Sequence, residues 1–287
     1  MDWTPSLQQE FFRRLKQNQL AEGGFPYYPG GKPAVEPTLH AILALTEIKE
    51  NPDGQLAWQW VLKQQNPDGS IGVGPHAPKE GLWLTAHFLL ASAHLSDPAA
   101  GSRAAPFLLA FCSKGGGRED YVDQDNALIG WPWTKDTFGW VEPTAWALMA
   151  LHKVGMGNSP RAIEGRKLLL DRKIPSGGWN YGNRVVLASE LLPFVDTTAL
   201  ALMALHGYVS LDQVASSLDL LERILASSET PYSLALIAMT LRLYGRPVNR
   251  VQSVLLDQMS TQAPEVTNVA HWSLGLMSFS ERNPLLP

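Results

Sequence analysis

The sequence has little of several features, and each shortage excludes a class of protein. It contains one cysteine, Cys112, which excludes an internal disulfide and any zinc site built from several cysteines. Charged residues make up only 17% of the 287 residues, and 23 Lys and Arg are nearly balanced by 27 Asp and Glu. The formal net charge of -4 supplies no basic surface, so we expect no nucleic-acid partner.

Long apolar runs are also missing. No stretch approaches the roughly 18 apolar residues of a membrane-spanning helix. Residues 1–16 predict an amphipathic helix that lacks the apolar stretch of a signal peptide. We therefore expect a cytoplasmic protein, in which an exposed apolar patch would allow peripheral contact with a membrane. A chain of 287 residues can bury a large core, and no feature of it indicates an oligomeric state.

An internal repeat is the strongest signal present. Three closely matching segments begin at Glu36, Glu142 and Asp196. In each of them a threonine follows the acid by two residues and is followed by an apolar run. Weaker copies occupy residues 84–91, 231–238 and 268–275. Each copy is apolar nearly all round, which is typical of a helix that is buried on every side.

Amphipathic segments, with apolar residues three and four positions apart, separate these copies. Examples are residues 54–65, 159–171 and 211–227. Six buried helices that alternate with six amphipathic ones predict an all-α fold, a single α/α toroid of two concentric rings that spans residues 1–287. The inner helices run parallel because each returns through an outer helix, so their N-termini meet at one mouth. No segment alternates like a strand for long, and we expect no substantial sheet.

Loops rich in glycine and aromatic residues precede the expected inner helices and carry a resemblance to a known family. Gln64-Gln65-Asn66-Pro67-Asp68-Gly69-Ser70-Ile71 resembles the Q-x(n)-G-x-W repeat of the prenyltransferase and squalene-oxidase repeat superfamily, with Ile71 in place of Trp. Gly177-Gly178-Trp179 keeps the G-x-W half of that repeat. The resemblance covers nearly the whole chain and implies a toroid similar to squalene–hopene cyclases and other class II terpene cyclases.

One acidic segment resembles the catalytic motif of that family. Leu192-Pro193-Phe194-Val195-Asp196-Thr197-Thr198-Ala199 resembles D-x-D-D-T-A, with Phe194 and Thr197 in place of two of the three acids. The resemblance implies that Asp196 is the acid that protonates an alkene or epoxide, with Glu142 as a polarising neighbour. The alternative for these residues and for Glu36 is an acid that complements the helix dipole, worth about 0.3–1 kcal/mol.

Six aromatic side chains and one histidine are the candidate substrate-binding residues. They are Trp131, Trp133, Trp140, Trp146, Trp179, Tyr181 and His87. An aromatic wall suits a long isoprenoid, and ring faces stabilise cations by about 0.5–2 kcal/mol each. The alternative is that these tryptophans wedge the helices together, as repeat tryptophans do in the superfamily.

Two further groups of polar residues have less specific patterns. His40, His87 and His271 share a repeat column, and three histidines could bind a metal. Because the other repeats lack this histidine, we favour hydrogen-bonding pocket histidines and expect no metal and no cofactor. Asp123 and Asp125 also match part of D-x-D-D, but they precede a loop rather than a helix, which predicts a solvated acidic turn.

These observations and the resemblance together lead to a functional hypothesis. We expect an enzyme, a class II terpene-cyclase-like isomerase that cyclises a linear isoprenoid or prenylated small molecule after protonating it. The alternative is a non-catalytic toroid that binds an isoprenoid or lipid, or that serves as a scaffold.

Overall fold

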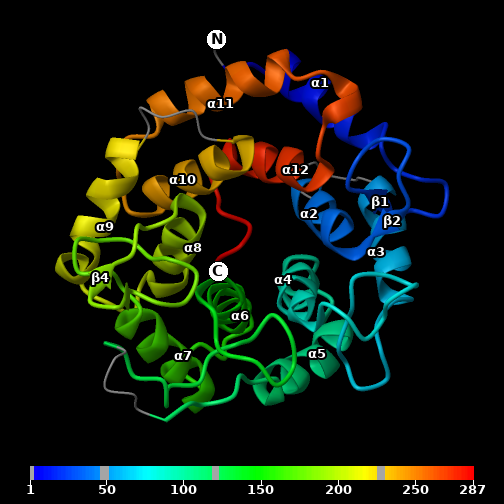
Figure 1. The fold of residues 1–287 in the computed structure, drawn as a ribbon. Helices are drawn as coiled ribbons and strands as arrows, with labels where there is room; N and C mark the ends of the chain where they lie inside the picture. Colours follow the sequence, from blue (N-terminus) through cyan, green and yellow to red (C-terminus); the bar gives the residue numbers. More distant parts are fainter. Residues whose placement is uncertain (1–2, 46–51, 118–122, 225–229) are drawn as a thin grey trace.

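The computed structural model of the protein describes residues 3–45, 52–117, 123–224 and 230–287, and these form two concentric rings of helices (Figure 1). The inner ring consists of α2 (Val35–Leu45), α4 (Thr85–His94), α6 (Val141–Lys153), α8 (Val195–Leu205), α10 (Pro231–Leu243) and α12 (Val269–Ser278). The outer ring consists of α1 (Pro5–Lys16), α3 (Pro52–Leu62), α5 (Pro98–Ala110), α7 (Pro160–Asp171), α9 (Leu211–Ile224) and α11 (Asn249–Thr261). The inner ring closes because α12 packs against α2, which confirms the expected single α/α toroid.

The amphipathic segments form outer helices with small shifts at their ends. The expected helix at 54–65 is α3, and the one at 159–171 is α7, whose N-cap Ser159 accepts a hydrogen bond from the backbone N–H of Ala162. The segment 211–227 is α9 up to Ile224, and residues 225–227 lie outside the described residues. Helix ends shift because a capping side chain, and not the apolar period, decides where a helix begins.

Strands are few and short within the described residues. β1 (Phe25–Pro26) pairs with β2 (Pro33–Ala34), and β3 (Val185–Val186) pairs with β4 (Ser189–Glu190), both antiparallel. Two short 3-10 helices, η1 (Leu82–Leu84) and η2 (Pro264–Val266), also lie in connecting loops. The absence of a substantial sheet among the described residues agrees with the sequence.

A column of buried threonines explains why the repeat segments match. Each threonine hydroxyl at the start of an inner helix accepts a hydrogen bond from a backbone N–H of the preceding loop. The pairs are Phe25 N with Thr38 at 2.8 Å, Ile71 N with Thr85 at 3.1 Å, Trp131 N with Thr144 at 2.9 Å and Trp179 N with Thr198 at 2.9 Å. The threonines therefore hold the loops over the N-terminal ends of the inner helices, where they form the mouth.

The opposite end of the inner ring is closed by the C-terminal segment, which lies at the centre of the ring in Figure 1. Leu285 and Leu286 are buried there. At the C-terminal end of α6, Lys153 donates a hydrogen bond to the backbone oxygen of Pro284 at 3.0 Å. The C-terminal segment therefore lies at the end of the ring opposite the N-terminal mouth, where the repeat places its acids.

Candidate functional site

Three carboxyl side chains lie at the mouth, one on the first turn of each of three inner helices, of which α6 and α8 are direct neighbours. Glu36 lies on α2, Glu142 on α6 and Asp196 on α8, and all three are half-buried. The repeat positions them there, because each acid precedes its loop-binding threonine by two residues. We call these three residues the acidic cluster.

Glu142 has the most perturbed environment in the cluster. Burial raises its pKa to about 7, and the charges of Asp196 and Glu36 add to this effect, while a hydrogen bond with the Trp146 side chain opposes it. A helix N-terminus also favours the ionised form, by about 0.3–1 kcal/mol. The rise from the ordinary glutamate pKa of 4.5 corresponds to roughly 3 kcal/mol, so burial and like charge outweigh the helix dipole.

Two tyrosines lie beside the cluster. The Tyr27 hydroxyl donates a hydrogen bond to a Glu36 carboxylate oxygen. Burial raises the pKa of Glu36, and this hydrogen bond acts against the rise. Burial raises the pKa of Tyr232 on α10, and the charges of all three acids raise it further. Tyr232 is therefore close enough to sense every member of the acidic cluster.

Two buried histidines and a tryptophan form a floor one helical turn below the acids. His40 follows Glu36 by four residues on α2, Trp146 follows Glu142 by four on α6, and His87 comes from α4. The His87 ring centroid lies 4.1 Å from that of Trp146 and 5.3 Å from that of His40. Positions i and i+4 lie on the same face of a helix, so His40 lies beneath Glu36 and Trp146 beneath Glu142.

The floor histidines are neutral. Burial lowers the pKa of His40 to about 3, with a smaller contribution from His271, and burial lowers the pKa of His87 well below its ordinary value. Both ring nitrogens of His40 and the Nδ1 of His87 lack a hydrogen-bond partner among the described residues. A buried polar atom without a partner costs about 1–3 kcal/mol, so these nitrogens are free to bind a ligand hydroxyl or a water.

The histidine column does not assemble a metal site in the described parts of the chain. His271 lies against Tyr232, with ring centroids 4.9 Å apart. No group of three or more His, Cys, Asp or Glu side chains among the described residues has an arrangement that could hold a metal ion.

The candidate substrate-binding residues divide into two groups. Trp131 and Trp179 lie inside the walls, 1% and 0% exposed, and their indole N–H groups donate to the backbone oxygens of Leu108 at 2.8 Å and Leu169 at 2.6 Å. These bonds tie the mouth loops to the outer ring and favour the packing alternative for both residues.

The other candidates lie at or beneath the mouth. Trp133 packs edge-on against Trp83, with ring centroids 4.8 Å apart, and Trp83 packs edge-on against His87 at 5.2 Å. Trp140 is the N-cap residue of α6, two residues before Glu142. Tyr181 is exposed and stacks on Phe194 of the α8 loop. Aromatic rings thus continue from the floor outward to the rim of the mouth.

Asp123 and Asp125 lie in an exposed turn, as expected from the sequence. The Asp125 carboxylate accepts a hydrogen bond from the backbone N–H of Ala127 at 2.9 Å, and Asp123 forms an ion pair with Arg184 at 3.4 Å. These contacts are those of a surface turn and do not join the acidic cluster.

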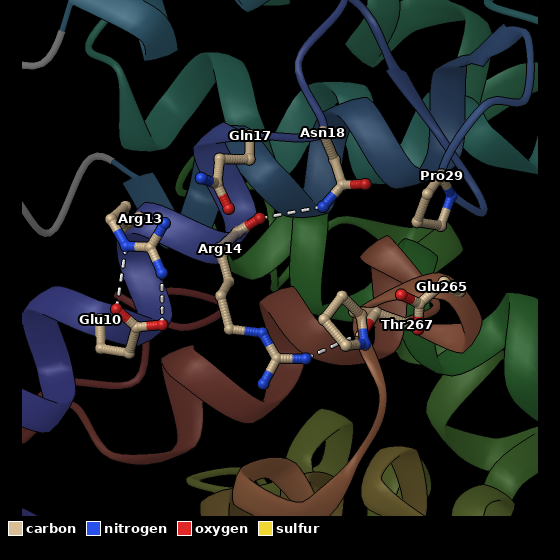
Figure 2. Close-up of a pocket in the computed structure, with 9 residues that line it drawn as sticks. Glu10, Arg13, Arg14, Gln17, Asn18, Pro29, Glu265 and Thr267 are labelled. Carbon is tan, nitrogen blue, oxygen red and sulfur yellow. Dashed lines mark hydrogen bonds and ion pairs between the residues drawn. The ribbon is translucent and has the colours of Figure 1, made fainter.

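A separate surface cavity of about 430 Å³ lies between α1 and the loop that contains η2 (Figure 2). Three of its charged groups have partners: Arg13 pairs with Glu10 at 2.6 Å, and Arg14 donates to the backbone oxygen of Gln262 at 2.9 Å. The Arg14 contact fastens α1 to the chain near α12. None of the seven candidate substrate-binding residues and none of the acidic cluster lines this cavity.

Several solved structures with the same fold are glycosidases. A glycosidase variant in complex with glucose is 13% identical, with a TM-score of 0.64 over 98% of this chain and 97% of that chain. The α-1,6-mannanase GH76A of Salegentibacter sp. HEL1_6, in an inactive variant with two aspartates replaced by asparagine and in complex with α-1,6-mannotriose, is 11% identical, with a TM-score of 0.63 over 98% of this chain and 99% of that chain.

A third similar structure, a protein from Actinoplanes, is 17% identical, with a TM-score of 0.61 over 89% of this chain and 78% of that chain. At these identities the likeness shows the α/α toroid fold. No protein-family model matches the sequence, and no curated protein does. The described part of the chain contains no helix long and apolar enough to span a membrane.

The assignment to the prenyltransferase and squalene-oxidase repeat superfamily is therefore wrong, and so are the class II cyclase activity and the isoprenoid partner that it implied. Two of the similar toroids are glycosidases whose structures contain sugars. The alternative of a non-catalytic, isoprenoid-binding toroid gains no support from them. The physical reason for the error lies in the repeat motif: Gln65 donates to the backbone oxygens of Gly69 at 3.1 Å and Ala100 at 3.4 Å, so it fastens the loop after α3 to the next outer helix, α5, which is a packing role.

Proposed function

We propose that the protein is a glycoside hydrolase that cleaves a neutral oligosaccharide or polysaccharide at the acidic cluster. The observation that carries this proposal is Glu142, a carboxyl group at the mouth whose pKa is raised to about 7 by burial and by the charges of Asp196 and Glu36. Glycoside hydrolysis uses one carboxylic acid that is still protonated near neutral pH and a second carboxylate that is ionised.

The proposed roles follow from the environments of the three acids. Glu142 gives its proton to the glycosidic oxygen as the bond from that oxygen to the anomeric carbon breaks. Asp196, whose charge helps to keep Glu142 protonated, acts either as the base that takes a proton from the attacking water or as the nucleophile that water later displaces. Glu36, which already accepts a hydrogen bond from Tyr27, binds a substrate hydroxyl.

The floor of the site suits an uncharged sugar. His40 and His87 stay neutral over the working pH range because burial disfavours their charged forms. A neutral imidazole has one donor and one acceptor nitrogen, and a sugar hydroxyl can both donate and accept. An anionic sugar would meet the negative charge of the acidic cluster without a compensating cation from the floor.

Two of the similar solved structures support glycoside hydrolysis by analogy, because they share the fold of this chain and are glycosidases. One of them binds glucose and another is an α-1,6-mannanase bound to α-1,6-mannotriose. We therefore take α-1,6-linked manno-oligosaccharides as the first substrates to test, with malto-oligosaccharides and cello-oligosaccharides beside them.

The test is to incubate the full chain with these oligosaccharides at mildly acidic pH and to identify products by mass spectrometry. We expect cleavage that falls by roughly 10²–10⁴-fold in Glu142→Gln, the loss typical of a missing general acid, and by a large factor in Asp196→Asn. Glu22→Gln, which changes an exposed glutamate of the same type, is the matched control and retains the activity. No cleavage by the unaltered protein, or cleavage that survives Glu142→Gln, would overturn the proposal.

The anomeric configuration of the first product, followed by NMR, assigns the role of Asp196. Retention of configuration requires that Asp196 be the nucleophile, and inversion requires that it be the base.

A further inference from the structure

Two cavities at the start of α6 share a wall that includes Phe138 and Trp140. The first, the indole cavity, has a volume of about 440 Å³ and is lined by Trp133, Phe138 and Trp140 among others. The second, the amide cavity, also has a volume of about 440 Å³ and is lined by Phe138, Trp140 and three amide side chains. Both volumes fall in the range of about 300–1,000 Å³ that small-ligand sites occupy.

Both cavities are connected to the catalytic mouth through named contacts. Trp140 lines both and precedes Glu142 by two residues at the start of α6. Trp133, on the indole cavity, packs against Trp83, which packs against His87 of the floor. A chain extending outward from the acidic cluster would therefore meet the indole cavity and the amide cavity along one wall.

The amide cavity offers uncharged hydrogen-bonding groups in fixed positions. The side-chain Nε2 of Gln124 donates to the Oδ1 of Asn126 at 3.0 Å and to the Oδ1 of Asn183 at 2.7 Å. This arrangement turns the two asparagine amides so that their NH₂ groups remain as donors. The Oε1 of Gln124 is buried and has no hydrogen-bond partner among the described residues, which is the kind of polar atom that a bound ligand or water satisfies.

Aromatic surface accompanies these amides. Phe138 is 68% exposed although it is a large apolar residue. Gly182 packs against the Trp140 ring, and a Cβ on Gly182 would be only 3.2 Å from that ring. The exposed Phe138 ring and the Trp140 ring, which Gly182 supports, give flat apolar surface next to the amide donors. A sugar ring presents an apolar C–H face and polar hydroxyl groups, and these two surfaces match them.

The charged residues around the amide cavity are neutralised by protein groups. Arg172 donates to the Asp171 carboxylate and to the backbone oxygen of Asp125, at 3.3 and 3.2 Å. Lys114 forms an ion pair with Asp136 at 3.8 Å. Because the cations on this wall are engaged, the cavity favours an uncharged ligand over a phosphate or a carboxylate.

We propose that the indole cavity and the amide cavity are subsites for consecutive neutral sugar residues of a glycan chain that extends from the acidic cluster. This inference rests on the proposed function, because the two cavities would bind the sugar residues that extend beyond the bond cleaved at the acidic cluster. It makes the protein an enzyme that prefers longer glycans to disaccharides.

The test measures binding separately from cleavage. The full chain carrying Glu142→Gln is titrated calorimetrically with α-1,6-linked manno-oligosaccharides, malto-oligosaccharides and cello-oligosaccharides, each from disaccharide to hexasaccharide. We expect one series to bind roughly tenfold or more tightly as hexasaccharide than as disaccharide, which corresponds to about 1.4 kcal/mol. Adding Phe138→Ala or Asn183→Ala is expected to remove most of this ratio.

Matched controls lie far from the cavities. Leu211→Ala removes an exposed apolar side chain at the start of α9, and Asn158→Ala removes an exposed amide before α7. Both controls should keep the ratio. Because the readout is a ratio of affinities within one protein, a variant that is partly unfolded lowers both affinities and leaves the ratio intact.

The outcomes separate the two proposals. Cleavage by the unaltered protein with the same affinity for every chain length would overturn the subsites and leave the hydrolase standing. Length-dependent binding that depends on Phe138 and Asn183, without cleavage by the unaltered protein, would support the subsites and overturn the hydrolase. Binding of none of the three series would overturn both.

Discussion

Replacement of Glu142 by glutamine should stabilise the protein at alkaline pH and have little effect on stability at acidic pH. The change keeps the size of the side chain and removes its charge. Glu142 has a pKa of about 7 in the folded protein, against 4.5 for an ordinary glutamate. The folded state therefore holds this proton more tightly than the unfolded state does.

The sign of the effect follows from proton binding. Between about pH 4.5 and about pH 7 the folded protein binds more protons at Glu142 than the unfolded chain, so its stability falls as the pH rises. The full difference corresponds to roughly 3 kcal/mol, because one pKa unit is about 1.4 kcal/mol. Glu142→Gln avoids this loss, because the amide has no proton to release.

The assay is denaturant unfolding of both proteins at about pH 4 and about pH 8. The stability of Glu142→Gln relative to the unaltered protein should increase by roughly 3 kcal/mol between the two values. Glu22→Gln, on an exposed turn, should show no such increase. An equal stability difference at both pH values would refute the reasoning, because it would mean that Glu142 ionises at little cost in the folded protein.

Three other changes test the site and the repeat. Asp196→Asn should lower the pKa of Glu142 from about 7, because it removes one of the charges that raise it. An NMR titration of the Glu142 side chain measures this pKa, and an unchanged pKa would mean that the charge of Asp196 does not act on Glu142. Thr144→Val removes the buried hydroxyl that accepts the Trp131 N–H at 2.9 Å and should lower the free energy of unfolding by about 1–3 kcal/mol, measured by denaturant unfolding. Gly69→Ala should cost about 2 kcal/mol or more in thermal unfolding, because Gly69 has a φ of +88° and a Cβ there would lie 2.1 Å from a backbone oxygen of α5; a loss below about 1 kcal/mol would contradict the motif's structural role.

Much of the architecture follows from the sequence. Helices that are apolar all round must be buried on every side, and amphipathic helices between them must cover them, so the alternation predicts two rings. The spacing between Glu142 and Thr144, repeated in two other segments, also predicts that acids gather at one mouth, since parallel helices begin at the same end. Both the apolar patterning and the spacing between acid and threonine are local properties, so the repeat in the sequence shows them directly.

The reaction class could not be predicted in the same way. The motif around Asp196 and the glycine and tryptophan loops suggested terpene chemistry. In the structure, the loop tryptophans instead pack the loops against the outer helices. Trp131 and Trp179 resemble rim aromatics in the sequence, and only the structure shows their indoles turned into the wall to bind outer-helix carbonyls. Which way a loop side chain turns depends on partners that are distant along the chain.

The sequence by itself determined the toroid, its mouth and the acids around it. The tertiary structure alone decided that Glu142 is the proton-holding acid, because its pKa depends on burial and on charges from two other helices. It also decided that Gln124, Trp140 and Asn183 share one cavity, because residues so far apart in the chain meet only after the rings close. Burial and long-range electrostatics are properties of the assembled fold, and no local pattern carries them.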